Sequence, residues 1–140
     1  MAKLNSKMTI YLDFDGTVVE HHYPAIGAEN PHALRVIRAL QDQGHSVILN
    51  TYRADLNDGS LEESLAYLND PERNLLPITQ HTPLKIHPGP FDLNEAIRFN
   101  KVFLDDIAES IPLIPNRVLD HGLMVDWVSV ELELQKFGLL

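Results

Sequence analysis

The chain has 140 residues, of which 44% are hydrophobic and 22% charged, and it contains no cysteine. This composition is typical of one globular domain, residues 1–140, and the lack of cysteine excludes disulfides, thiolate metal sites and cysteine nucleophiles. The formal net charge of −9 repels polyanions, which counts against a nucleic-acid partner. No apolar run is long enough to span a membrane, and no apolar segment follows the N-terminal lysines. We therefore expect no membrane partner, no signal peptide and a cytoplasmic location.

A first buried strand is predicted over residues 9–14, and carboxylates occur where it ends. Asp13 and Asp15 are two residues apart at the point where the strand becomes a loop. Burying an unpaired carboxylate is costly, so a divalent cation is an expected partner. Gly16 permits a tight turn, and the backbone amides around it could bind phosphate oxygens.

The next elements follow from capping residues and apolar spacing. Residues 20–27, EHHYPAIG, predict a loop. A helix follows, with Asn30 as its N-cap, Pro31 at its first position and Gly44 at its end. Its apolar residues share one face: Ala33, Leu34, Ile37 and Leu40. Residues 46–50, SVILN, predict a second buried strand.

A second helix is predicted from Ser60, which forms a capping-box pattern with Glu63, to the Asp-Pro pair at residues 70–71. Residues 75–79 predict a third strand. Pro77 places this strand at a sheet edge, because proline cannot donate to the ladder.

The last part of the chain repeats these signals. Asp92 and Glu95 form a cap pattern before a short helix, and residues 102–104 predict a fourth strand. The tail fits a strand period through Val128, Val130, Leu132 and Leu134, or one helical face through Trp127, Val130, Leu134 and Phe137. Its length favours the helix.

Alternating strands and helices predict an α/β fold, a Rossmann-like three-layer sandwich with a mainly parallel sheet. In such sheets ligands bind beyond the carboxyl ends of the strands. The polar residues that end the predicted strands are Asp13, Asp15, Thr51, Asp105 and Asp106. We expect them to converge at one edge of the sheet. Carboxylates there could bind Mg²⁺, and Asp13 could also act as a nucleophile.

The strand ends resemble the motifs of the haloacid dehalogenase-like (HAD) superfamily, chiefly phosphatases. Residues 13–17, DFDGT, resemble its first motif, DxDxT. Residues 47–51, VILNT, resemble the second, an apolar strand ending in Ser or Thr. Residues 102–106, VFLDD, resemble the fourth, an apolar strand ending in paired acids. The motifs occur in the same order as in the family.

The resemblance implies a Mg²⁺-dependent phosphohydrolase that forms an aspartyl-phosphate on Asp13. Asp15 would be the general acid and base, and would also bind Mg²⁺ through its carbonyl. Thr51 would bind the phosphoryl group. Asp105 would hold the metal, with Asp106 assisting directly or through water. The alternative is a module of the same fold that binds metal or a phosphorylated ligand with little or no turnover.

The lysine of the third motif is Lys85 or Lys101. Lys101 precedes the fourth strand and should lie roughly 10–13 Å from Asp105, at about 3.3 Å per residue. Lys85 follows the third strand on the active edge, so geometry favours Lys85. Arg53 could bind phosphate or form a surface salt bridge.

The remaining loops bear on access and specificity. Residues 17–30 leave room for a flap but not for the cap domain of many family members, so the site should be open or closed by another subunit. Specificity would reside in residues 20–27, 80–90 and 111–122. His21 and His22 could suggest a zinc site, but adjacent loop histidines are more often solvated, and we expect that here. His81 and His87 flank Lys85 and could line the pocket, although loop histidines without a role are favoured. The substrate would be a small phosphorylated molecule or an exposed phosphate on a larger partner.

Overall fold

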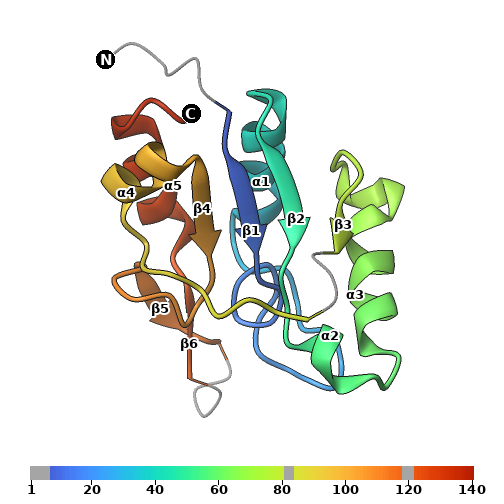
Figure 1. The fold of residues 1–140 in the computed structure, drawn as a ribbon. Coiled ribbons are helices and arrows are strands. Elements are labelled where there is room, and N and C mark those ends of the chain that lie inside the picture. Colours follow the sequence, from blue (N-terminus) through green and yellow to red (C-terminus); the bar gives the residue numbers. More distant parts are fainter. Residues whose placement is uncertain (1–6, 81–83, 118–121) are drawn as a thin grey trace.

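The computed structural model describes residues 7–80, 84–117 and 122–140. No helix within these ranges is both long and apolar enough to span a membrane. The elements follow one another as β1 (Thr9–Leu12), α1 (Ala33–Asp42), β2 (Ser46–Leu49), α2 (Arg53–Leu56), α3 (Ser60–Asn69), the 3₁₀ turn η1 (Pro71–Arg73), β3 (Thr79–Gln80), α4 (Leu93–Phe99), β4 (Lys101–Leu104), β5 (Leu113–Pro115), β6 (Leu123–Val125) and α5 (Trp127–Lys136) (Figure 1).

The main sheet has four strands in the order β3-β2-β1-β4, and every neighbouring pair is parallel. Thr9 pairs with Ser46 in β2 and with Lys101 in β4, so the three longer strands are in register. Their arrows point the same way, and their carboxyl ends meet at the lower edge in Figure 1. The predicted α/β fold with a mainly parallel sheet is confirmed.

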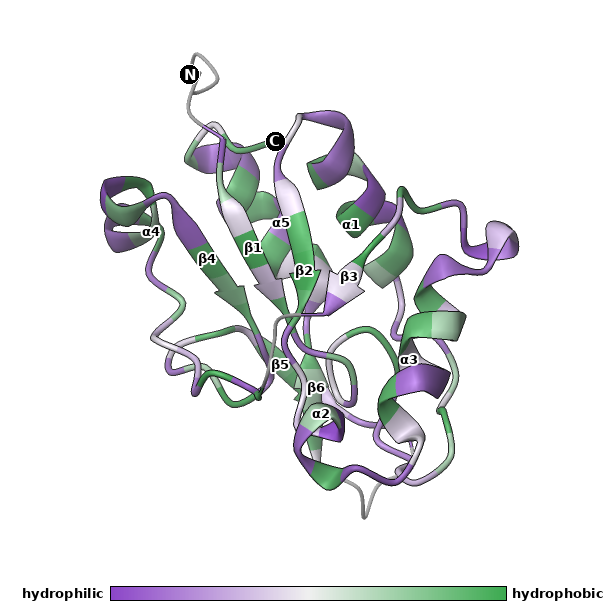
Figure 2. Ribbon diagram, turned by 45° about the vertical axis from the view of Figure 1, so that its right-hand side comes forward, coloured by the Kyte–Doolittle hydropathy of each residue, from purple (hydrophilic) through white to green (hydrophobic). Residues whose placement is uncertain are grey.

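One face of the sheet packs against α1 and α5, which lie behind it in Figure 1. Alternate strand residues point to this face and are buried, and the strands carry hydrophobic residues in Figure 2. The largest fully buried side chains of this core include Ile10, Leu12, Ile37, Leu40, Leu49, Leu104 and Trp127. This core holds the strand ends at fixed positions.

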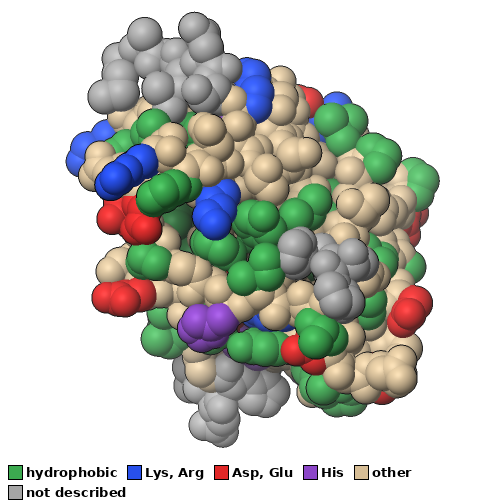
Figure 3. Space-filling model, in the orientation of Figure 1, with side chains coloured by type: hydrophobic (Ala, Val, Ile, Leu, Met, Phe, Trp, Pro, Cys, Tyr) green, Lys and Arg blue, Asp and Glu red, His purple; other side chains and the backbone are tan. Residues whose placement is uncertain are grey.

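The opposite face of the sheet is only partly covered. Its residues Tyr11, Ile48 and Phe103 are of intermediate burial, and the rings of Tyr11 and Phe103 stack at 5.0 Å. Figure 3 shows hydrophobic side chains in the middle of the face turned to the viewer. The strands therefore alternate between buried and half-buried positions, where a continuous apolar run had predicted burial on both faces.

Two predicted N-terminal helix caps are wrong. Helix α1 begins at Ala33, after His32 at φ 70°, and Asn30 makes no cap. The buried Asn30 side chain instead donates to the carbonyls of Thr17 and Val125, at 2.9 and 2.7 Å. Its amide thus serves the loop after β1, a tertiary role that overrides the local cap preference.

Helix α3 includes Ser60 as its first residue, so the predicted capping box is absent. Asp58 accepts the Ser60 N–H at 2.9 Å, and Gly59 at φ 87° precedes the helix. The cap predicted for α4 is confirmed, because the Asp92 carboxylate accepts the N–H groups of Asn94 and Glu95.

The third strand lies at the sheet edge as predicted, but it is shorter and later than expected, over Thr79–Gln80. Side-chain amides form hydrogen bonds with the backbone of the residues that precede this strand. Gln41 bonds both the N–H and the C=O of Leu76, and Asn69 does the same for Ile78. These amides replace the ladder that a longer strand would need.

The tail forms helix α5, as its length predicted. Before it, β5 and β6 form an antiparallel hairpin that sequence reasoning missed, because each strand has three residues and β5 ends in proline. The Val125 N–H of β6 donates to the Gly16 carbonyl at 2.9 Å. The hairpin therefore supports the loop that follows β1.

Candidate active site

Three carboxylates meet at the carboxyl edge of the sheet, as predicted. Asp13 follows β1, and Asp105 and Asp106 follow the neighbouring β4. One oxygen from each lies within 4.8 Å of the others. Asp13 and Asp105 are buried, and Asp106 is partly buried. Such a set of oxygen donors is of the kind that holds Mg²⁺.

Lys85 reaches into this cluster, and Lys101 does not. The Lys85 Nζ lies 3.4 Å from Asp13 Oδ1 and 2.8 Å from Asp105 Oδ2, and its side chain is 1% exposed. Its backbone N–H is held by Asp55 at 3.0 Å. Lys101 begins β4 opposite Thr9, at the amino end of the sheet. The geometric preference for Lys85 is confirmed, and its role stays a prediction.

The charges of the cluster are strongly coupled. Burial raises the pKa of Asp13 well above its usual range, and the charge of Asp105 raises it further against the opposing effect of Lys85. Burial also raises the pKa of Asp106, with a further contribution from Asp105. For Lys85, burial alone would lower the pKa, but the attraction of Asp13 and Asp105 outweighs it and raises the pKa. One ammonium thus faces three carboxylates, and the site favours a further cation.

The residues fit a divalent cation on a second ground. Asp105 Oδ2 is buried, and its neighbour is the Lys85 ammonium at 2.8 Å. One ammonium leaves further lone pairs of this carboxylate open, so Asp105 can also ligate a cation.

Asp15 has a different partner from the other acids. Its two oxygens accept from Arg53 Nε at 2.7 Å and Nη2 at 2.8 Å. Arg53 also donates to the Ala25 carbonyl at 3.1 Å and lies over the rings of Phe14 and Tyr23. The Arg53 side chain is 1% exposed, so the surface salt bridge considered for it is wrong. Burial lowers the pKa of Arg53, but the pairing with Asp15 more than offsets this and raises it.

The contribution of Asp15 to a metal site is therefore limited to its backbone. The carboxylates that lie close together are those of Asp13, Asp105 and Asp106, whereas the Asp15 carboxylate forms an ion pair with Arg53. The expected metal contact through the Asp15 carbonyl stays a prediction.

Gly16 allows the loop to approach the acids closely. It has φ +76°, and a Cβ there would overlap the ring of His21 and lie 2.7 Å from Asp106 Oδ2. Its N–H already donates to the Val19 carbonyl at 2.8 Å. The Gly16 N–H is thus engaged within the loop, and phosphate binding by the other amides around it stays a prediction.

Two threonines lie at the site, one of which the sequence predicted. Thr51 is buried at the end of β2, and its hydroxyl accepts the Arg53 N–H at 3.2 Å. Thr17, to which sequence reasoning gave no role, donates its hydroxyl to Asp13 Oδ2 at 3.2 Å and accepts the Asp106 N–H at 3.2 Å. Its carbonyl is held by the Trp127 indole N–H at 2.7 Å. The sequence signal that could have identified Thr17 is its position as the last residue of the DFDGT motif.

His21 is a site neighbour, so its prediction as a solvated residue is wrong. Its Nε2 lies 3.0 Å from Asp106 Oδ2 and 2.8 Å from the Leu123 carbonyl. His22 and His87 are exposed. His81 lies outside the described residues, as do parts of two predicted specificity loops, residues 81–83 and 118–121.

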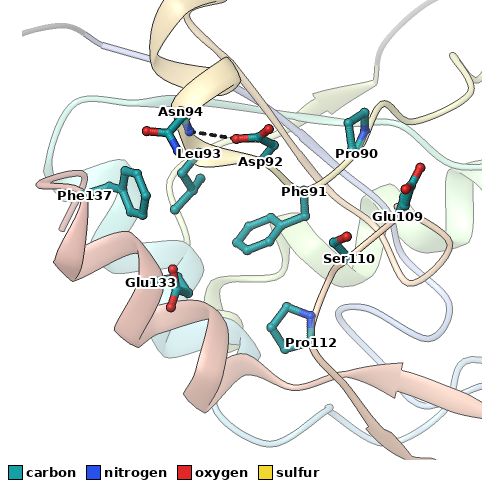
Figure 4. A pocket seen from close by; sticks show the side chains of 10 residues that line it. All are labelled: Pro90, Phe91, Asp92, Leu93, Asn94, Glu109, Ser110, Pro112, Glu133 and Phe137. Carbon is teal, nitrogen blue, oxygen red and sulfur yellow. Dashed lines mark hydrogen bonds between the residues drawn. The ribbon is translucent and has the colours of Figure 1, made fainter.

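A cavity of about 620 Å³ lies elsewhere, between the start of α4, residues 109–112 and α5 (Figure 4). Phe91 and Phe137 line it together with Glu109 and Glu133. None of its lining residues is a predicted site residue, and the chemistry of the acids therefore does not involve it.

Comparison with known proteins supports the fold. No protein-family model matches the chain, and no curated protein matches it. Among solved structures, the chain is similar to a conserved protein from Bacteroides thetaiotaomicron, with a TM-score of 0.57 and 26% sequence identity over 93% of this chain and 90% of that one. The similarity extends over nearly the whole of both chains, and we conclude that this is a single-domain α/β fold with a parallel sheet.

Proposed function

We propose that this chain is a Mg²⁺-dependent phosphohydrolase of the HAD type, which cleaves phosphomonoesters through an aspartyl-phosphate on Asp13. The observation that carries the proposal is the buried cluster of Asp13, Asp105 and Asp106, with Lys85 between Asp13 and Asp105. Carboxylates placed to hold Mg²⁺, with a lysine beside the nucleophile, supply the positioning and charge stabilisation on which phosphoryl transfer depends.

Asp13 is oriented for attack by contacts to both of its oxygens. Thr17 donates to Oδ2, and the Lys85 ammonium lies 3.4 Å from Oδ1. Lys85 can also neutralise charge on the phosphoryl oxygens during transfer. Mg²⁺ held by Asp13, Asp105 and Asp106 would polarise the phosphoryl group when bound.

The reaction needs two proton transfers, one from Asp15 to the leaving alcohol and one from water to Asp15. Asp13 forms a bond to phosphorus while the bond from phosphorus to the alcohol oxygen breaks, and the alcohol takes a proton from Asp15. Water then attacks phosphorus, returns a proton to Asp15, and releases inorganic phosphate and free Asp13. Because both Asp15 oxygens accept from Arg53, Asp15 must turn away from Arg53 to reach the substrate.

The ion pair between Asp15 and Arg53 also favours a second candidate function. A module that binds a metal and a phosphorylated ligand without turnover would need no mobile acid at residue 15. The bidentate hydrogen bonds between Arg53 and Asp15 are what such a module would be expected to keep.

Phosphate release from 4-nitrophenyl phosphate, with Mg²⁺ and with EDTA, separates the two functions. Asp13→Asn and Asp15→Asn are the test variants, and Asp42→Asn, an exposed carboxylate on α1 paired with Arg38, is the matched control. We expect Mg²⁺-dependent release in wild type and control, none from Asp13→Asn, and slower turnover in Asp15→Asn.

Two other outcomes of this assay would contradict the proposed function. Release without metal, or full activity in Asp13→Asn, contradicts the nucleophile assignment. No release from a broad panel of phosphorylated metabolites, together with a Mg²⁺-dependent rise in melting temperature that Asp105→Asn abolishes, favours the binding module.

A further inference from the structure

The loop after β1 forms one side of an open cavity beside the acids. This cavity has a volume of about 510 Å³ and is lined by His21, His22, Tyr23, Pro24 and Ala25. His21 also contacts Asp106, since its Nε2 lies 3.0 Å from Asp106 Oδ2. His21 therefore borders both the cavity and the acid cluster.

The walls of this cavity consist of two imidazoles, the Tyr23 ring, Pro24 and Ala25, and carry no carboxylate, lysine or arginine. The two cations near it point elsewhere: Arg53 binds Asp15 beneath the Tyr23 ring, and Lys85 binds the acids, both with side chains 1% exposed. The Tyr23 ring is held in place, because its hydroxyl donates to Asp58 and Arg53 lies 5.1 Å from its centre. It is a fixed, half-exposed aromatic surface.

Further apolar side chains surround the acids. Tyr52, Ile107 and Leu123 are each about half-exposed. Each is tied to the cluster: the Lys85 ammonium lies over the Tyr52 ring, Ile107 donates its N–H to Asp105, and the Leu123 carbonyl contacts His21. The alcohol part of a phosphate ester bound at the acids would thus lie near apolar side chains. The net charge of the protein, −9, also repels a second anionic group on that ester.

We propose that the site takes phosphomonoesters whose alcohol part is apolar, preferably aromatic, and carries no second anionic group. This inference rests on the proposed phosphohydrolase activity and names its substrate class. Stacking on Tyr23 supplies affinity for a planar group, whereas a second anion would find no lysine or arginine among the residues that line the cavity.

Matched esters of the same primary alcohol type test it without a difference in leaving-group chemistry. The comparison is kcat/KM for 2-(4-methylphenyl)ethyl phosphate, 2-(4-carboxyphenyl)ethyl phosphate and glycerol 1-phosphate, each with Mg²⁺. We expect the methyl compound to exceed both others by about tenfold or more. Tyr23→Ala should bring the ratio of kcat/KM for the methyl compound to that for glycerol 1-phosphate close to one, while Tyr23→Phe should keep the wild-type ratio.

The failures of the two proposals differ. Equal kcat/KM for the methyl and carboxyl compounds, or an equal loss for all esters in a folded Tyr23→Ala, overturns the substrate class and leaves the phosphohydrolase standing. No release from any ester overturns the phosphohydrolase and the substrate class together.

Discussion

Replacing Arg53 with methionine removes a cation on which one site acid depends. The change abolishes the hydrogen bonds to both Asp15 oxygens and the one to the Ala25 carbonyl. Breaking a fully buried ion pair costs roughly 3–5 kcal/mol. The Arg53 side chain is 1% exposed but Asp15 is 19% exposed, so water can partly solvate the abandoned carboxylate. We therefore expect the free energy of unfolding to fall by about 2–3 kcal/mol.

Urea unfolding of Arg53→Met, Asp15→Asn and the double variant measures this pair as a cycle. A coupling free energy of about 1 kcal/mol or more is expected, because the residues are in direct contact. Arg38→Met is the matched control: its partner Asp42 is more than half exposed, and we expect a loss of at most about 1 kcal/mol. Equal losses in the two methionine variants, or additive effects in the cycle, would refute the reasoning.

Three further predictions concern the loop, the acids and a buried histidine. Gly16→Ala should lower the free energy of unfolding by at least about 1–2 kcal/mol in urea titrations, because of its positive φ and the overlap with His21; an unchanged midpoint contradicts this. Asp13→Asn should raise the melting temperature in EDTA, since burial and Asp105 raise the pKa of Asp13 and make its ionisation costly at neutral pH; a lower melting temperature contradicts this. His45 accepts the Met8 N–H at Nδ1, so its Nε2 donates to a carbonyl, and burial lowers its pKa. As the pH falls below the ordinary value of 6.5, the unfolded chain binds the proton first, so stability should drop from pH 7 to 5. His45→Gln should flatten that slope, and an equal slope in wild type and variant contradicts the assignment.

The position of the acids was predictable from the sequence because it depends only on where the parallel strands end. Parallel strands end at the same edge, so Asp13 and Asp105 had to meet once strands were predicted over residues 9–14 and 102–104. Lys85 followed from the same rule, because it comes after the third strand and Lys101 comes before the fourth. These inferences need only the direction of each strand.

The partners of the site residues were not predictable in this way. Arg53 reaches Asp15 because α2 starts at residue 53 and the loop at residue 25 closes over it, which depends on the packed tertiary structure. The contact between His21 and Asp106 depends on the missing Cβ of Gly16, because a Cβ there would overlap the His21 ring and lie 2.7 Å from Asp106 Oδ2. Neither feature has a local sequence signal, and the solvated interpretation of His21 failed for this reason.

A phosphoryl group on Asp13 is the central claim, and mass spectrometry tests it most directly. Asp15→Asn is mixed with 4-nitrophenyl phosphate and Mg²⁺ and quenched in acid, and the peptide that contains Asp13 is then sequenced. Because this ester needs little help from a general acid but hydrolysis of the intermediate needs a base, the intermediate should accumulate. We predict one added phosphoryl group on Asp13, absent with EDTA and absent when Asp13 is also changed to Asn. Turnover without any phosphorylated peptide, or a phosphoryl group on another residue, would contradict the claim.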